Sequence, residues 1–103
     1  MNVVNVNKDN FEEEVLRSEL PVLMDIWAPW CGPCKMLGPV VEEVAAESDK
    51  FKVVKLNADE APELAQSYQV VSIPTLLVFK GGKEVNRSVG LIAKEDIYKL
   101  LEA

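Results

Sequence analysis

The fold and the chemistry of this chain are decided by residues 27–35, which read WAPWCGPCK. Cys31 and Cys34, its only cysteines, stand three positions apart in this stretch. The preceding residues form an apolar, strand-like run and the following ones a helix-like run. Because a thiol becomes more acidic at the start of a helix, the stretch predicts a redox centre rather than a structural crosslink.

Length and composition predict one domain, residues 1–103, without linkers or repeats. With 103 residues, 49% of them hydrophobic and 27% charged, the chain is long enough to bury roughly two-thirds of its unfolded surface. Its core therefore does not depend on a disulfide for stability.

The charge balance and the apolar pattern limit the partners and the location. Seventeen acidic and eleven basic side chains leave a net charge of −6, which repels a phosphate backbone, so we expect no nucleic acid partner.

The longest apolar stretch, residues 21–30, is interrupted by Asp25, and the first ten residues lack a signal-like pattern. We expect a cytoplasmic protein without a membrane segment. A close cysteine pair in that reducing compartment is more often catalytic or metal-binding than structural.

Hydrophobic periodicity predicts strands alternating with helices, in the order β-α-β-α-β-α-β-β-α. A nearly continuous apolar run at 22–27 is typical of a central strand that is covered on both faces. Gly81 and Gly82 join two β-prone runs and predict a hairpin. The expected fold class is α/β, with a central mixed sheet flanked by helices on both faces. The strands are expected at 3–6, 22–27, 51–56, 75–80 and 83–89, and the helices after Asn7, from Cys31, at 62–68 and at 94–102.

The spacing of the cysteines assigns them different roles. Residues i and i+3 share a helix face, so the pair can close into a disulfide. Free N–H groups and the dipole at the helix start stabilise a Cys31 thiolate, the predicted nucleophile. Cys34 lies one turn deeper and is the predicted resolving thiol. Gly32 permits close backbone approach and Pro33 fixes one dihedral angle, so both are expected to tune ring closure.

Three other interpretations of the pair compete with a redox centre. A zinc site needs about four ligands, and two cysteines without any histidine leave only a site shared between chains or completed by carboxylates. A structural disulfide would close a very short loop and add little stability. Two unrelated buried thiols are the third alternative. We expect neither a metal nor an organic cofactor.

Asp25 is the second informative residue, because a carboxylate within an apolar strand is costly to bury and its pKa rises. One interpretation is an exposed or salt-bridged side chain, with Lys55 of the neighbouring strand as its partner. The other is proton transfer, in which Asp25 takes the Cys34 proton, directly or through water. The pattern leaves both open, since ion-pair networks also perturb pKa values.

The chain resembles the thioredoxin family over essentially its whole length. The resemblance implies the thioredoxin fold, with the cysteines at the start of a long helix. It rests on residues 27–35, Pro39, Lys55-Leu56-Asn57 with Asp59, Ile73-Pro74-Thr75, Gly82 and Gly90.

The resemblance also implies a substrate-binding surface beside the cysteines. The Ile73–Pro74 bond is expected to be cis, and Ile73 to offer backbone hydrogen bonds to an extended substrate. Trp30, Pro74 and Gly90 are expected to line an apolar docking surface. Lys55 is placed, with Gly32 and Pro33, among the residues that tune the redox pair.

The predicted function is general protein-disulfide reduction. Cys31 attacks a target disulfide, and Cys34, deprotonated with help from Asp25, resolves the mixed disulfide. The expected partners of this monomer are protein disulfides and a thioredoxin reductase. Gly-Pro between the cysteines favours a reductant, because oxidases and isomerases of the superfamily usually place histidine there. Two rival functions are a binding module with incidental cysteines and a thiol oxidase or isomerase.

Overall fold

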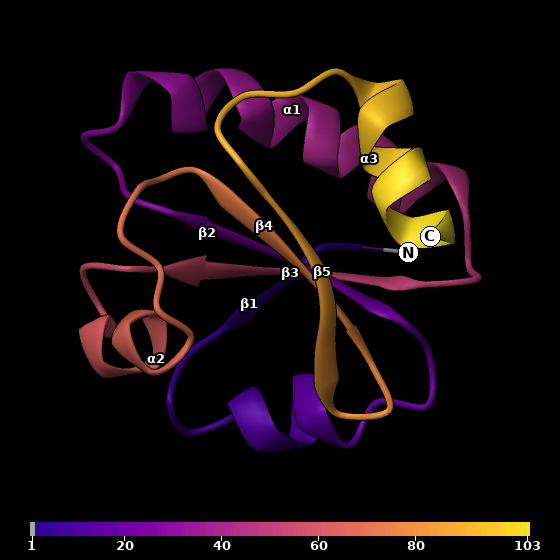
Figure 1. Cartoon of the computed structure of the whole chain (residues 1–103), viewed down its shortest axis with the longest axis horizontal. Helices are drawn as coiled ribbons and strands as arrows, with labels where there is room; N and C mark the ends of the chain where they lie inside the picture. Colours follow the sequence, from indigo (N-terminus) through magenta and orange to yellow (C-terminus); the bar gives the residue numbers. More distant parts are fainter. Residues whose placement is uncertain (1) are drawn as a thin grey trace.

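A five-stranded mixed sheet forms the centre of the computed structural model, which describes residues 2–103 (Figure 1). The spatial order of the strands is β1-β3-β2-β4-β5. The pairs β1–β3 and β3–β2 are parallel, whereas β2–β4 and β4–β5 are antiparallel. The strands are β1 (Val4–Val6), β2 (Val22–Trp27), β3 (Lys52–Asn57), β4 (Thr75–Lys80) and β5 (Lys83–Val89).

Helices cover both faces of this sheet (Figure 1). On one face lie α1 (Gly32–Glu47) and α3 (Lys94–Glu102), and on the other lie the π-helical turn η1 (Glu12–Leu16) and α2 (Pro62–Ser67). The predicted element order and the mixed sheet between two helical layers are confirmed. The boundaries differ by a residue in places; β3, for instance, begins at Lys52 rather than at Phe51.

Two apolar clusters, one on each face, form the core. Strand β2 contributes to both because its side chains alternate between the faces. Leu23 packs in the cluster beneath α1 and α3, whereas Met24 and Ile26 pack in the cluster beneath η1 and α2. This alternation places Asp25 on the α1 face.

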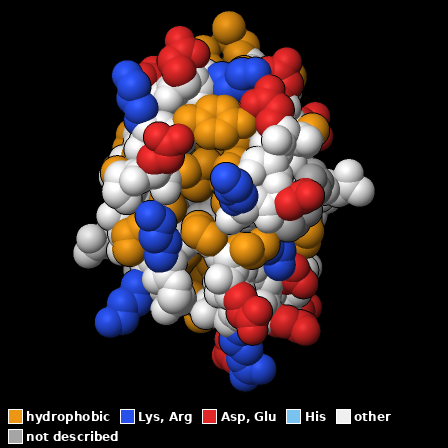
Figure 2. Space-filling model, turned by 90° about the vertical axis from the view of Figure 1, so that its right-hand side faces the viewer, with side chains coloured by type: hydrophobic (Ala, Val, Ile, Leu, Met, Phe, Trp, Pro, Cys, Tyr) orange, Lys and Arg blue, Asp and Glu red, His pale blue; other side chains and the backbone are white. Residues whose placement is uncertain are grey.

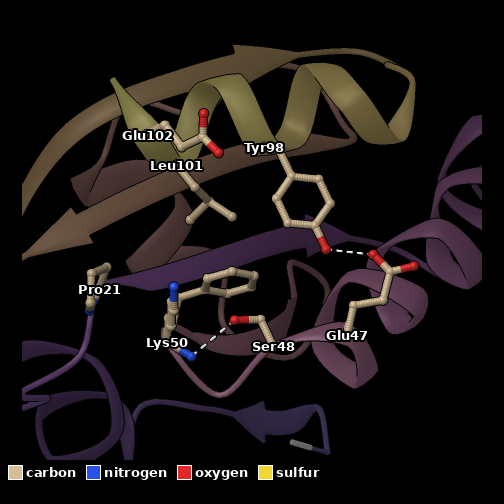
Figure 3. Close-up of a pocket in the computed structure, with 8 residues that line it drawn as sticks. Pro21, Glu47, Ser48, Lys50, Tyr98, Leu101 and Glu102 are labelled. Atoms are coloured by element: carbon tan, nitrogen blue, oxygen red, sulfur yellow. Dashed lines mark hydrogen bonds between the residues drawn. The ribbon is translucent and has the colours of Figure 1, made fainter.

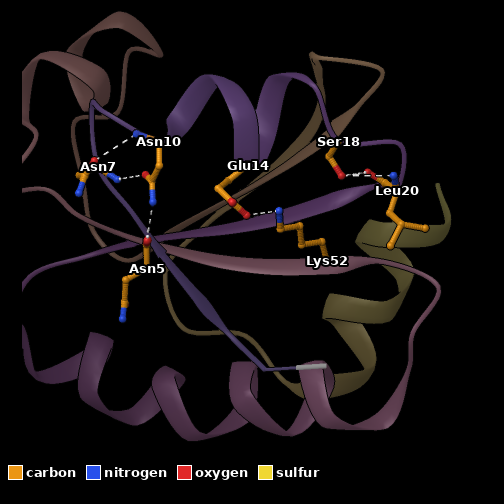
Figure 4. A network of polar contacts seen from close by, with 7 residues as sticks. All are labelled: Asn5, Asn7, Asn10, Glu14, Ser18, Leu20 and Lys52. Carbon is orange, nitrogen blue, oxygen red and sulfur yellow. Dashed lines mark hydrogen bonds and ion pairs between the residues drawn. The ribbon is translucent and has the colours of Figure 1, made fainter.

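The first helical segment differs from the expected α-helix. The Arg17 N–H donates to the Glu12 carbonyl five residues earlier, at 2.9 Å, which is the wider π-helical pattern. Phe11 and Val15 remain buried in this turn, and Glu14 forms an ion pair with Lys52 of β3 (Figure 4). The π-helical turn, in place of the expected α-helix, therefore occurs where the segment packs on the core and forms an ion pair with β3.

The sequence predicts that Asn7 caps the first helix, but the N-cap of η1 is Phe11, which makes no side-chain capping hydrogen bond. Asn7 instead stabilises the turn that precedes η1. Its side-chain oxygen accepts hydrogen bonds from the backbone N–H groups of Asp9, at 2.8 Å, and Asn10, at 3.2 Å. In return, the Asn10 side-chain oxygen accepts from the Asn7 N–H at 2.7 Å (Figure 4). These bonds satisfy backbone donors of the turn that leads into η1.

The predicted glycine hairpin joins β4 and β5. Gly81 and Gly82 have φ angles of 60° and 80°, a left-handed region that favours glycine. A Cβ atom on Gly82 would also lie 2.8 Å from the Leu16 carbonyl oxygen. Beyond the turn the ladder contains a bulge, which the sequence did not predict: Val78 pairs with Asn86 and Phe79 with Glu84, so Val85 is the extra residue.

Candidate functional site

Cys31 and Cys34 lie where the chain passes from β2 into α1, at the left-hand end of the sheet in Figure 1. We call this the dithiol end. Cys31 is the N-cap of α1 and has extended backbone angles, while Gly32 and Pro33 begin the helix. The two cysteines form a disulfide with their Cα atoms 5.2 Å apart. The predicted proximity of the pair is confirmed.

The two sulfurs have different surroundings. The Cys31 sulfur accepts the Cys34 backbone N–H at 3.2 Å and lies 3.8 Å from the Ile73 carbonyl oxygen. A free N–H at the helix start favours negative charge on the sulfur that it contacts. Both residues are nearly buried, Cys31 at 5% and Cys34 at 3% exposure. The hydrogen bond therefore distinguishes them more than exposure does.

Asp25 is fully buried on the face that α1 covers. Within residues 2–103, neither of its carboxylate oxygens has a hydrogen-bond partner. Burial raises the pKa of Asp25 from 3.8 to about 6, and the positive charge of Lys55 opposes that rise. The alternative of an exposed Asp25 is wrong, and the described residues contain no ion pair between Asp25 and Lys55.

Lys55 lies beside Asp25 in the sheet, since the two residues are in register on parallel strands. Its ammonium nitrogen is 4.6 Å from the ring centroid of Trp27, within range of a cation–π contact. A Cβ atom on Gly38 of α1 would lie 3.7 Å from that nitrogen. Because Gly38 follows Cys34 by one helical turn, the Lys55 ammonium and the Cys34 side of α1 face the same region.

The Ile73–Pro74 peptide bond is cis, as expected. The Gly90 N–H donates to the Pro74 carbonyl at 2.8 Å, and the Thr75 hydroxyl donates to the Ser72 carbonyl at 2.6 Å. Ile73 is half-buried and Pro74 is buried. Pro74 therefore contributes little to the exposed apolar surface that was expected to include it.

Exposed apolar side chains lie close in the chain to residues of the site. Trp30 is 70% exposed, and its indole N–H donates to Asp59 at 3.1 Å. Val71, at 96%, and Leu91, at 45%, are also exposed. Sequence reasoning assigned no site role to Val71, Leu91 or Asp59. The available signal was their closeness in the chain to predicted site residues, since Val71 lies two positions before Ile73 and Leu91 follows Gly90.

A half-open pocket of about 490 Å³ lies at the opposite end of the sheet, where β2 and β3 begin. Figure 2 shows this pocket end, with apolar side chains gathered between acidic and basic ones. Tyr98 donates from its hydroxyl to Glu47 across the pocket (Figure 3). The pocket lacks a thiol and is far from the dithiol along β2. Its lining residues are Pro21, Glu47, Ser48, Lys50, Phe51, Tyr98, Leu101 and Glu102.

Over the described chain, no cluster of three or more His, Cys, Asp or Glu side chains is arranged to hold a metal ion. None of the described helices has the length and apolar character needed to cross a membrane.

A cysteine pair at the start of a helix, beside a cis-proline and following a strand with a buried carboxylate, is the site of a thiol–disulfide oxidoreductase. Comparison with known proteins agrees: the thioredoxin family model matches residues 2–103. The chain belongs to the thioredoxin family, and its cysteine pair undergoes dithiol–disulfide exchange.

Three relatives illustrate the similarity. "Thioredoxin M-type, chloroplastic" from Chlamydomonas reinhardtii is 52% identical over 98 residues, 94% of this chain and 70% of the relative. "Thioredoxin 1" from Nostoc sp. is 51% identical, and "Thioredoxin" from Synechocystis sp. is 53% identical. Each of those two matches covers 94% of this chain and 92% of the relative.

Proposed function

We propose that this chain is a general reductase of protein disulfides in which Cys31 attacks and Cys34 resolves. The observation that carries this assignment is the position of the Cys31 sulfur. It caps α1, accepts the Cys34 N–H and lies 3.8 Å from the Ile73 carbonyl oxygen. A thiolate in this position is stabilised by the helix start and lies beside the backbone that is proposed to bind substrate.

The reaction transfers two electrons from the dithiol to the target. The Cys31 thiolate bonds to one target sulfur, and the other target sulfur leaves as a thiolate. The Cys34 thiolate then attacks the Cys31 sulfur and releases the second target thiolate. Protons from Cys34 and from solvent neutralise the target thiolates, and the chain is left with the Cys31–Cys34 disulfide.

Asp25 is the proposed acceptor of the Cys34 proton, directly or through water. With a pKa of about 6, Asp25 is mostly ionised at pH 7 and close enough to neutral pH to exchange protons. Its carboxylate has no hydrogen-bond partner among the described side chains and backbone groups, so no fixed contact competes for the proton. Lys55 has a tuning role, because its positive charge favours the ionised form.

An extended segment of the target is proposed to pair with the Ile73 backbone. Trp30 and Gly90, with the buried Pro74 beneath, form the docking surface. The exposed Val71 and Leu91 add apolar area to that surface.

The remaining proposals concern the location of the chain, its oligomeric state, its electron donor and the residues between the cysteines. We place the chain in the cytoplasm as a monomer, with residues 1–103 forming one thioredoxin domain that a thioredoxin reductase returns to the dithiol form. Gly32 and Pro33, exposed in the first turn of α1, are proposed to tune ring closure. No bound cofactor is required, since the two sulfurs carry the electron pair.

Reduction of insulin by dithiothreitol tests the function. The native chain should accelerate the reaction and a Cys31→Ser variant should not, because the variant lacks the nucleophile. Met36→Ala, at an exposed position of α1, is the control and should retain native activity. Equal rates for native and Cys31→Ser chains would contradict the reductase and favour a binding module.

Equilibration with glutathione distinguishes a reductant from an oxidase or isomerase. We expect Cys31–Cys34 to be reduced in a mostly reduced glutathione buffer. A pair that stays oxidised there would contradict the proposed direction of electron flow.

A further inference from the structure

Strand β5 and Gly90, the residue that follows it, contact both ends of the segment that carries the cis-proline. We call residues 69–74 the substrate loop. At its end, the Gly90 N–H donates to the Pro74 carbonyl at 2.8 Å. At its start, the Arg87 guanidinium donates to the Tyr68 carbonyl at 2.7 Å. The second anchor is a side chain, so a substitution can remove it without altering the backbone.

The Arg87 guanidinium is itself held in place by Glu84. Its Nε and Nη2 atoms donate to the two Glu84 carboxylate oxygens at 2.6 and 2.8 Å, a bidentate arrangement that fixes the guanidinium plane. The two side chains are only 33% and 24% exposed. Partial burial and two hydrogen bonds make this pair more rigid than a typical surface ion pair.

The β-bulge makes the Arg87–Glu84 pair possible. In a regular strand, residues three apart point to opposite faces. The extra residue Val85 shifts the alternation, so that Arg87 pairs with Leu77 and Glu84 with Phe79. Leu77 and Phe79 both belong to the cluster beneath η1 and α2. The bulge therefore brings both charged side chains to the face on which Tyr68 lies.

The start of the substrate loop has a constrained backbone. Gln69 has a φ of 57°, a left-handed conformation that is unfavourable for a residue with a Cβ atom. The Arg87 bond falls on the carbonyl directly before Gln69, where the chain turns out of α2. Beyond it, Val71 and Ser72 are exposed, so they contribute little packing that could hold the loop.

We propose that Arg87 is a positioning residue of the substrate loop. Through the Tyr68 carbonyl, it pre-organises the Ile73 backbone for pairing with an extended target, and so sets the affinity for protein disulfides. This inference rests on the proposed function, in which Ile73 binds the target. Arg87 does not touch the sulfurs, so the dithiol chemistry is independent of it.

An Arg87→Met variant tests the proposal, because methionine retains an unbranched apolar stem but cannot donate to Tyr68 or Glu84. Loss of a charged hydrogen bond and of pre-organisation should raise KM for insulin roughly three- to tenfold, with kcat nearly unchanged. Hydrogen exchange at residues 69–73 should become faster. The rate with a small aromatic disulfide and the redox potential of Cys31–Cys34 should stay at native values.

Asn86→Ala is the matched control. Asn86 neighbours Arg87 on β5, and its side-chain oxygen accepts from the Arg87 backbone N–H at 3.0 Å. Its side-chain amide donates to the Leu100 carbonyl of α3 at 3.4 Å, on the other face of the sheet. Asn86→Ala therefore removes side-chain contacts of β5 without touching the Arg87 guanidinium. The Asn86→Ala substitution should lower the melting temperature without changing KM for insulin. The role of Arg87 would be overturned if KM for insulin were unchanged in Arg87→Met, or if KM rose equally in both variants. It would also be overturned if Arg87→Met lost activity toward the small disulfide in parallel. Failure of the native chain to reduce insulin would instead overturn the proposed function.

Discussion

Each end of the sheet has a carboxylate with a shifted pKa, and the two carboxylates differ in burial, in hydrogen bonding and in the direction of the shift. At the dithiol end, Asp25 is buried, has no hydrogen-bond partner in residues 2–103, and its pKa is raised to about 6. At the pocket end, Glu47 is exposed, and hydrogen bonds from Lys94 and Tyr98 lower its pKa.

The difference shows which end is suited to chemistry. A satisfied carboxylate such as Glu47 connects α1 to α3, through Lys94 at 2.7 Å, and remains ionised near neutral pH. An unsatisfied buried carboxylate such as Asp25 lowers stability but gains a pKa suited to proton transfer. The pocket of about 490 Å³ is at the pocket end and not beside the dithiol, so concavity does not mark the site of the chemistry.

The largest expected effect is on stability, in an Asp25→Asn variant. The pKa of Asp25 is about 6 in the folded chain, against 3.8 for an aspartate in water, so the folded state holds the proton more tightly. Below pH 3.8 the carboxyl is neutral in both the folded and the unfolded state, and the native chain has no penalty. As the pH rises from 3.8 to above 6, the native chain loses about 3 kcal/mol of unfolding free energy.

Urea denaturation at several pH values measures this effect. Because asparagine resembles the neutral carboxyl, the variant should be more stable than the native chain by about 3 kcal/mol at about pH 8 and equally stable at about pH 3. A stability difference that does not change with pH would contradict the raised pKa of Asp25.

The next effect is kinetic. Asp25→Asn should slow resolution of the mixed disulfide roughly tenfold or more at pH 7, because the proton acceptor is lost. The first attack by Cys31 should change less. In the native chain, the resolution rate should rise as Asp25 ionises around pH 6, and this inflection should be absent from the variant.

Single-turnover kinetics of the preformed mixed disulfide provide the measurement. Glu47→Gln is the matched control, since it removes one carboxylate from the pocket end. If the two variants resolve the mixed disulfide at the same rate, Asp25 has no part in the proton transfer and the comparison between the ends fails.

The smallest effect is expected from Glu47→Gln itself. Its hydrogen bonds with Lys94 and Tyr98 lower the pKa of Glu47 below the ordinary value of 4.5. Their stabilising contribution is therefore present above pH 4.5 and lost as the pH falls through the pKa of the folded chain. Calorimetry at about pH 7 should show a slightly lower melting temperature, and at about pH 2 no difference from the native chain. A larger loss in acid than at neutral pH would contradict this sign.

Local patterns predicted the element order because each element carries its own periodicity. The nearly continuous apolar run at 22–27, for example, predicted a strand covered on both faces, and this covering accounts for the burial of β2 and of Asp25 within it. The π-helical turn at Arg17 and the bulge at Val85 could not be predicted, since they depend on contacts with distant segments. The cis bond at Pro74 followed from the family resemblance alone.

For the site, the cysteine spacing predicted the pair and its place at the helix start. It did not predict how the surrounding surface is built. Val71 and Leu91 are exposed because of the path of the loops, and Arg87 reaches Tyr68 only because the bulge turns it toward α2. Such features arise from tertiary geometry, which hydrophobic patterning does not encode.

The central claim, that Cys31 attacks and Cys34 resolves, is tested most directly by trapping the mixed disulfide. Reduced Cys34→Ser and Cys31→Ser variants are each mixed with an oxidised protein substrate, and the adducts are mapped by peptide mass spectrometry. We expect a stable adduct through Cys31 in the Cys34→Ser variant and almost none in the Cys31→Ser variant. Equal adduct formation through Cys34 would contradict the assigned roles.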